Sequence, residues 1–355
     1  MKRSTHLMIG IVYYMSQLLG VLAFSYNYDT GKLQTTIGIT IYSCMVSVLM
    51  FCSLPILFRV QWKPRNVNGP ELHYKINALM CLLHIVAVLI TVLLNWSKRK
   101  EYIRTIRDFQ HARNRLLQKF VMSDKVQQYF EKSIRSKFYW GLMYNIITFV
   151  ASYDILRGIF DIESPIIIMG LGAIATVLNI IMTHYFFALL NVNVLLAVIN
   201  EELKRILNTS SQLFKLQRLK QIKPGILITT CCQLADELQD LAINQYNLQN
   251  IGDRVNRMYD LQGSCVVLTL YMNNISVIYM TYMMLLHEEL SQDYGTITVM
   301  IIMPIAVFFY YMDLRIFTES MLNFGDCVKN TKDLLKNLQH CLPTLDERFE
   351  KSHIR

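Results

Sequence analysis

Residues 165–200 read PIIIMGLGAIATVLNIIMTHYFFALLNVNVLLAVIN and contain no Asp, Glu, Lys or Arg over 36 positions. No Gly or Pro follows Gly172, so this sequence predicts one continuous helix. At about 1.5 Å per residue it would be about 54 Å long, whereas the hydrocarbon core of a bilayer is roughly 30 Å thick. We therefore expect a helix that crosses a membrane and continues beyond it.

Further apolar runs of similar character occur along the chain. They are residues 36–58, 76–96, 138–156, 263–286 and 296–312, of which only 138–156 contains a charge, at Asp154. Of all residues, 53% are apolar and 17% are charged, against roughly 25% charged in soluble chains. This composition excludes an ordinary water-soluble enzyme. It predicts an all-α, polytopic helical membrane protein with six clear spans.

A seventh apolar segment, residues 7–28, follows Lys2 and Arg3 and is interrupted by polar and aromatic residues such as Tyr13 and Gln17. These interruptions and the basic flank favour a segment that dips into the membrane. If the segment instead spans, the N-terminus is outside and there are seven spans. Residues 1–312, apart from their long basic connections, form the expected transmembrane region.

Basic residues are concentrated on alternate connections. Lys and Arg number 12 in residues 97–137, 8 in 201–262 and 7 in 313–355, against 4 in 59–75. Cytoplasmic loops of membrane proteins carry such an excess. We therefore expect a multi-pass plasma-membrane protein with these three regions in the cytoplasm. The net charge of +9 then reflects orientation in a lipid bilayer, and no nucleic acid is expected as a partner.

The C-terminal region carries a narrow apolar stripe, which predicts a helix that packs against another helix. Thr331 is the polar member of this stripe, and Pro343 ends it. Its expected packing residues are Leu314, Phe317, Met321, Phe324, Val328, Leu335, Leu338 and Leu342. Together with an amphipathic helix in 97–137 and the extension of the long helix near 200, the stripe predicts a cytoplasmic helical bundle that acts as an anchor.

No sequence motif indicates catalysis, a metal or a cofactor, so we expect no enzyme activity. Asp154 and Arg157 lie on one helix face near the predicted outer end of a span, where they form an interfacial ion pair or, with Tyr153, anchor a ligand. Tyr279 and Tyr282 are either interface-belt residues or the lining of an apolar pocket. Polar residues inside the spans are expected to join helices by hydrogen bonds, among them Asn179, His184 and Asn193.

Two stretches carry a family resemblance. The first is YYMSQLLGV at residues 13–21, followed by FSYNYDTG at 24–31; the second is VINEEL at 198–203, with Asn200, Glu202 and Leu203 as the family motif. With the spacing of the apolar runs and the basic cytoplasmic loops, the chain resembles an insect gustatory receptor of the divergent type found in flies. The resemblance covers essentially the whole chain.

The resemblance implies a cytoplasmic N-terminus, a dipping N-terminal segment and a cytoplasmic bundle that anchors a homo- or hetero-tetramer with related receptors. It also implies a ligand-gated cation channel that small-molecule tastants open. The tastant pocket would lie in the outer half of the spans and involve Tyr153, Asp154, Tyr279 and Tyr282.

One feature of the family is missing. Its last span lines the pore and carries a Thr-Tyr-x5-Gln-Phe motif, but no membrane-length apolar run follows Met312 here. The chain is then either a shortened gene product or isoform, or a regulatory subunit that does not conduct.

A different class, a seven-helix G-protein-coupled receptor, requires residues 7–28 to span with the N-terminus outside.

Overall fold

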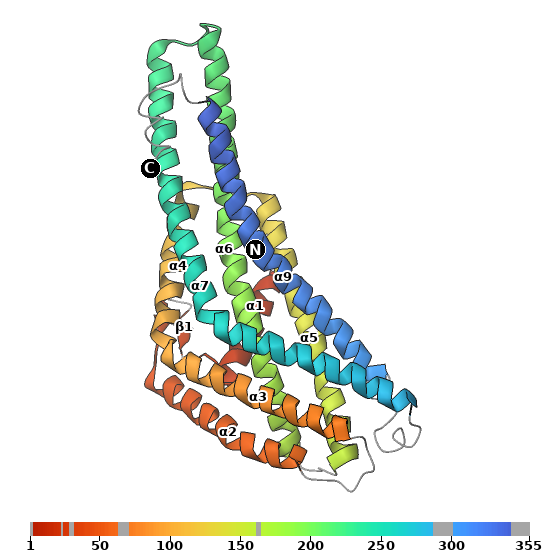
Figure 1. The fold of residues 1–355 in the computed structure, drawn as a ribbon. Helices are drawn as coiled ribbons and strands as arrows, with labels where there is room; N and C mark the ends of the chain where they lie inside the picture. Colours follow the sequence, from red (N-terminus) through yellow and green to blue (C-terminus); the bar gives the residue numbers. More distant parts are fainter. Residues whose placement is uncertain are drawn as a thin grey trace. The chain divides into compact units, whose positions relative to one another are not determined.

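The computed structural model describes residues 3–22, 24–27, 32–62, 71–160, 165–286 and 301–341. Apart from one short strand pair, these residues are almost entirely helical (Figure 1). The helices are α1 (Arg3–Leu18), α2 (Ile37–Trp62), α3 (Glu71–Ser97), α4 (Arg99–Lys119), α5 (Asp124–Phe160), α6 (Pro165–Arg218), α7 (Pro224–Leu286) and α9 (Met303–Cys341). The all-α expectation is confirmed.

The chain divides into two compact units. Unit 1 comprises Met1–Arg104, Ser133–Phe187 and Asn256–Phe317, and unit 2 comprises Thr105–Lys132, Ala188–Val255 and Thr318–Arg355. Helices α4, α5, α6, α7 and α9 contribute residues to both units.

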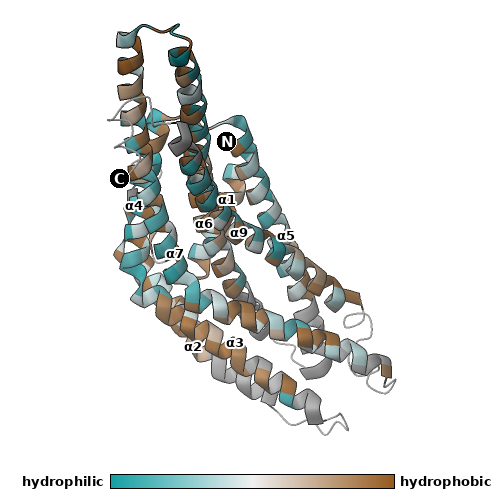
Figure 2. Ribbon diagram, turned by 45° about the horizontal axis from the view of Figure 1, so that its top comes forward, coloured by the Kyte–Doolittle hydropathy of each residue, from teal (hydrophilic) through white to brown (hydrophobic). Residues whose placement is uncertain are grey.

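Two stretches among the described residues are long and apolar enough to cross a membrane, Thr176–Arg218 in α6 and Pro224–Tyr279 in α7. A third results if Leu82–Ser97 and Arg99–Lys119, bent by 66° where they meet, count as one span. In α2, Met45 is 61% exposed and Leu49 is 67% exposed. Such large exposed apolar side chains favour contact with lipid, and Figure 2 shows α2 and α3 as strongly apolar elements.

The long helix is confirmed and exceeds its predicted length, because α6 runs for 54 residues from Pro165 to Arg218. Proline suits the first turn of a helix, since that position needs no N–H donor. At the far end, the N–H of Lys220 bonds to the Gln217 carbonyl and the N–H of Gln221 bonds to the Leu216 carbonyl. These bonds satisfy carbonyl groups that the helix end leaves free.

The N-terminal apolar segment contains a shorter helix than its 22-residue run allows. Helix α1 has 16 residues, so it is about 24 Å long. Strands β1 (Ser25–Asn27) and β2 (Lys32–Gln34) follow as an antiparallel pair, with Tyr26 opposite Leu33. The sequence analysis did not foresee this hairpin, because the aromatic and polar residues of 24–34 carry no regular alternation.

Some predicted features lie outside the described residues. These are residues 296–300 of the last apolar run, Leu342 and the rest of the C-terminal region, and residues 63–70, which belong to one predicted outer loop.

Candidate functional site

Unit 1 contains a buried ion pair between α5 and α9. Lys137 Nζ lies 2.6 Å from Asp313 Oδ2, and the two side chains are 1% and 16% exposed. The ammonium also lies 5.8 Å from the centre of the Phe186 ring. The second carboxylate oxygen of Asp313, Oδ1, is buried and has no hydrogen-bond partner among the described residues. A charge in such surroundings depends strongly on its partner, since desolvation costs several kcal/mol per ion.

This pair was not predicted from the sequence. Lys137 directly precedes the apolar run 138–156, and Asp313 directly follows the run 296–312. In the sequence, Lys137 counted only as one of the 12 basic residues of 97–137, and Asp313 only as the first residue of the C-terminal region 313–355. A usable signal was present, because two opposite charges stand at corresponding ends of two predicted spans.

Polar side chains join other helices of unit 1 as expected. The Asn179 amide donates to Asn145 Oδ1 over 2.7 Å, which links α6 to α5. Ser16 Oγ lies 2.7 Å from His184 Nε2, which links α1 to α6. These contacts confirm the prediction for Asn179 and His184.

The end of α1 is held by a glycine turn. Gly20 has a φ of 68°, the left-handed region that glycine adopts without a steric penalty. Its N–H bonds to the Gln17 carbonyl, and the N–H of Val21 bonds to the Ser16 carbonyl. Ser43 Oγ of α2 donates to the Gly20 carbonyl over 2.6 Å. The turn thus fixes α1 against α2.

A small pocket lies beside this turn. Its lining includes Gly20, Ser43, Ser47, Thr91 and Trp96. Ser47 Oγ accepts a bond from Trp96 Nε1, and the Thr91 hydroxyl is buried without a partner among the described residues. A water molecule has access to about 20 Å³, which is room for one or two waters and far too little for a drug-sized ligand.

In unit 2, Asn200 of the stretch 198–203 joins α6 to α9. The Asn200 amide of α6 donates to the Cys327 carbonyl of α9 over 2.9 Å. In return, the Thr331 hydroxyl donates to Asn200 Oδ1 over 2.6 Å. Leu203 is 2% exposed and packs in the same core. The Asn200 side chain therefore acts as donor and acceptor between two helices.

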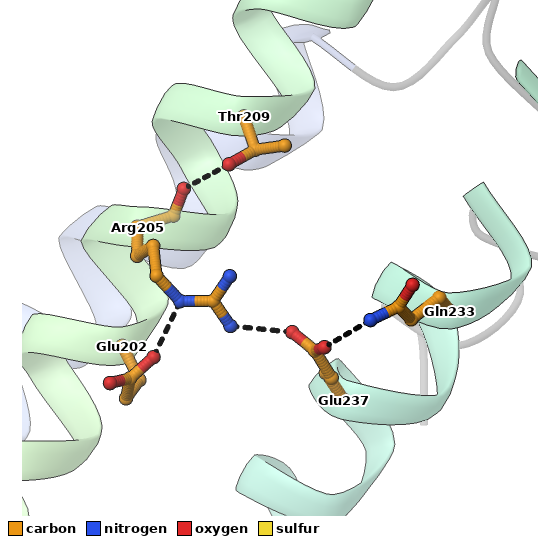
Figure 3. A network of polar contacts seen from close by, with 5 residues as sticks. All are labelled: Glu202, Arg205, Thr209, Gln233 and Glu237. Atoms are coloured by element: carbon orange, nitrogen blue, oxygen red, sulfur yellow. Dashed lines mark hydrogen bonds and ion pairs between the residues drawn. The ribbon is translucent and has the colours of Figure 1, made fainter. Parts of the chain in front are cut away.

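Figure 3 shows the polar network around Glu202, the remaining motif residue. The Arg205 guanidinium donates to Glu202 on the same helix over 2.7 Å and to Glu237 of α7 over 2.6 Å. Gln233 donates to the second oxygen of Glu237. Hydrogen bonds to Glu202 and then to Glu237 raise the pKa of the Arg205 guanidinium above its usual value.

The expected anchor stripe differs from the structure at one position. Phe317 is buried, whereas Met321 is 42% exposed. The neighbouring Ser320 is buried instead, and its carbonyl accepts a bond from the Asn193 amide over 2.7 Å. The Asn193 amide also lies 3.4 Å from the Ser320 hydroxyl, and a search for an apolar stripe does not select a serine. The Asn193 contact confirms that this residue joins helices.

The side chains of the other stripe residues on α9 differ in how far they are exposed. Leu314, Phe324, Val328 and Leu335 are half-buried, and Thr331 is fully buried; the side chain of Leu338 lies outside the described part of the chain.

The proposed ligand-pocket residues are only partly described. Tyr153 is 40% exposed on α5, and on α7 Tyr282 is 57% exposed while Tyr279 is half-buried. No hydrogen bond or ring contact joins these three rings among the described residues. The side chain of Asp154 lies outside the description.

We expect Thr331→Val to destabilise unit 2 by about 1–2 kcal/mol, because the buried Asn200 oxygen loses a donor. The measurement is the melting temperature of the purified receptor. Thr209→Val is the matched control, since Thr209 donates to the Arg205 carbonyl as Thr331 does to the Cys327 carbonyl, but it is only half-buried and bonds to no other helix among the described residues. It should change stability by less than about 0.5 kcal/mol. Equal effects of both variants would contradict a special role of Thr331.

These contacts define a class of protein: an all-α membrane protein whose interior polar groups join helices. Among the described residues, no group of three His, Cys, Asp or Glu side chains is placed to hold a metal ion. The family described as 7tm Chemosensory receptor matches residues 9–355. The chain belongs to this family.

Relatives in Drosophila melanogaster specify the branch. "Putative gustatory receptor 59d" is 25% identical over 351 residues, which cover 97% of this chain and 85% of that protein. "Putative gustatory receptor 36c" is 25% identical over 331 residues, which cover 90% of this chain and 79% of that protein. "Putative gustatory receptor 36b" is 22% identical over 351 residues. These similarities confirm the resemblance to insect gustatory receptors.

Proposed function

We propose that this chain is a taste receptor subunit that binds a small-molecule tastant and takes part in a ligand-gated cation channel. The observation that carries the proposal is the family match over residues 9–355. The names of the relatives support a gustatory function, and they support the proposal that the chain is a receptor rather than an enzyme. The subunit works in the plasma membrane with related receptors as a homo- or hetero-tetramer.

Ion currents in transfected cells test the proposal. Cells that express this chain alone, and cells that co-express it with a related receptor, are exposed to a tastant panel. A tastant-evoked cation current in cells that express this chain alone supports a conducting channel subunit. A response only with the relative assigns a binding or regulatory role to this chain. No tastant dependence in any combination, despite surface expression, would contradict the proposal.

The orientation is part of the proposal. The N-terminus and residues 97–137, 201–262 and 313–355 are cytoplasmic, and α1 dips into the inner leaflet. The 16-residue length of α1 supports dipping, because about 20 helical residues are needed to cross the hydrocarbon. An N-terminal tag should be inaccessible in intact cells. An accessible tag would favour the seven-helix G-protein-coupled alternative.

The tastant pocket lies in the outer half of the spans and is formed by Tyr153, Asp154, Tyr279 and Tyr282. For Asp154→Ala we expect at least a tenfold higher half-maximal tastant concentration at unchanged surface expression, because a charge-assisted hydrogen bond contributes about 1.5–3 kcal/mol. Ser47→Ala in the small pocket beside Gly20 is the control. An unchanged concentration dependence for every active tastant would remove Asp154 from the pocket.

Unit 2 contains most of the proposed cytoplasmic bundle. In the proposal, α9 with Phe324, Val328 and Leu335 packs against α6 and anchors the subunit in its assembly. The contacts of Asn193 and Asn200 with α9 support this role, because they fix the register between the two helices.

A further inference from the structure

The α6–α7 hairpin tip, residues 213–228 of unit 2, is strongly basic. Lys215, Arg218, Lys220 and Lys223 are all exposed there. Residues 203–235 contain no Asp or Glu, and among the described residues no ion pair engages these four cations. Elsewhere in unit 2, Arg254 pairs with Asp108 and Lys119 pairs with Asp240. The tip therefore presents uncompensated positive charge.

Large apolar side chains are exposed at the same tip. Leu219 is 64% exposed, Ile226 56%, Ile228 57% and Leu216 37%. By contrast, the branched side chains further along the two helices, such as Ile206 and Leu234, are buried. In Figure 2 the first turns of α7 are apolar although they stand at the end of the hairpin. Exposed apolar groups that cluster with charges mark an interaction surface.

The turn itself presents one of the cations. Lys220 has a φ of 52°, in the left-handed region where helices usually end with glycine. An L residue is disfavoured in this conformation, and glycine would relieve it. Glycine would also remove a positive charge from the centre of the surface. Such an outlier is a reason to suspect a functional constraint at this position.

We propose that the α6–α7 hairpin tip binds an acidic cytoplasmic protein that offers an apolar groove beside its carboxylates. Charge complementarity and the exposed Leu and Ile side chains argue for this occupant, because carboxylates beside an apolar groove would meet both the cations and the apolar side chains of the tip. Along α6, Arg218 lies 18 residues beyond Asn200, the last residue of the uncharged run. This is about 27 Å of helix, which argues against the receptor's own membrane as the occupant.

The test uses the purified full-length receptor in nanodiscs of neutral phosphatidylcholine, with Ca²⁺-loaded calmodulin as the acidic probe. Calmodulin opens its apolar groove only with Ca²⁺, so binding should be lost in EGTA. Charge reversal in K215E/K220E/K223E should weaken binding at least about tenfold. The control K100E/R104E/R107E removes three exposed cations from α4 and should retain affinity. L219Q/I226Q should also weaken binding, whereas I243Q should not.

Three outcomes would overturn the proposal. The first is that calmodulin shows no saturable binding, and the second is that the tip and α4 variants lose affinity for calmodulin equally. The third is that the tip binds vesicles with phosphatidylserine but not calmodulin. The last outcome would assign the surface to anionic lipid. The inference rests on the cytoplasmic side proposed for residues 201–262. The calmodulin assay needs no tastant, so a lack of calmodulin binding would leave the receptor proposal intact. In the same way, a lack of tastant-evoked current would leave a positive calmodulin result intact.

Discussion

Lys137→Met should destabilise the receptor by about 3–5 kcal/mol, because removal of one partner leaves the other as an uncompensated buried charge. Methionine has a similar length, so little packing volume is lost. The Asp313 carboxylate would then have lost its ion-pair partner, and its Oδ1 is buried without a hydrogen-bond partner among the described residues. Heating GFP-tagged receptor before size-exclusion chromatography measures the melting temperature, which should fall by at least about 5 °C.

Two further variants make this prediction specific. Lys137→Met/Asp313→Leu should recover most of the lost stability, since replacement of a buried ion pair by apolar residues is often neutral. The matched control is Lys119→Met, because the Lys119–Asp240 pair is 50% and 43% exposed. A surface pair contributes about 0–1 kcal/mol. If Lys137→Met cost no more than Lys119→Met, the pair would not be buried in the folded receptor.

Gly20→Ala should lower stability by about 2–4 kcal/mol for two separate reasons. An alanine in the left-handed conformation costs about 1–2 kcal/mol. Its Cβ would also lie 2.9 Å from the Cβ of Val46, and overpacking of this kind costs about 1–3 kcal/mol. We expect α1 to lose its fixed position on α2. The same heating assay measures the loss, and faster proteolysis of the N-terminal segment measures the detachment.

The two causes can be separated. Gly20→Ala/Val46→Gly removes both Val46 atoms that the added Cβ would meet but leaves the conformational strain, so it should differ from Val46→Gly alone by only about 1–2 kcal/mol. Gly10→Ala is the control within α1, because no atom lies within 4 Å of the added Cβ. It should be neutral or slightly stabilising, since alanine favours helix. A loss for Gly10→Ala as large as for Gly20→Ala would refute the role of the turn.

A helix could be predicted reliably from the sequence where helix packing and lipid contact both require uncharged, helix-forming residues. The long helix around residues 165–200 followed from the absence of charge, Gly and Pro, and the structure extends it to Arg218. Asn179, His184 and Asn193 were recognised as helix-joining residues because an apolar run leaves few polar partners. The positions of their partners, Asn145, Ser16 and Ser320, depend on which helices meet and were not predictable.

The contacts of unit 2 show why the remaining details could not be predicted. Ser320 and Thr331 are buried because their hydroxyl or carbonyl groups meet Asn193 and Asn200, although an apolar pattern selects Met321. The β1–β2 hairpin and the left-handed turn at Lys220 were likewise missed. The hairpin sequence has turn residues at Asn27 and Gly31, but its flanks lack the alternation typical of strands. The turn at Lys220 has neither Gly nor Asn at its left-handed position.

The amino-acid sequence alone determined the all-α class, the membrane character and the family. These properties depend on local composition and period, because hydrocarbon excludes charge and unpaired backbone groups wherever the helix lies. Only the tertiary structure decided that Lys137 meets Asp313 and that Asn200 joins α6 to α9. Such pairs form between residues more than 100 positions apart, so their existence depends on how whole helices pack and not on any local pattern.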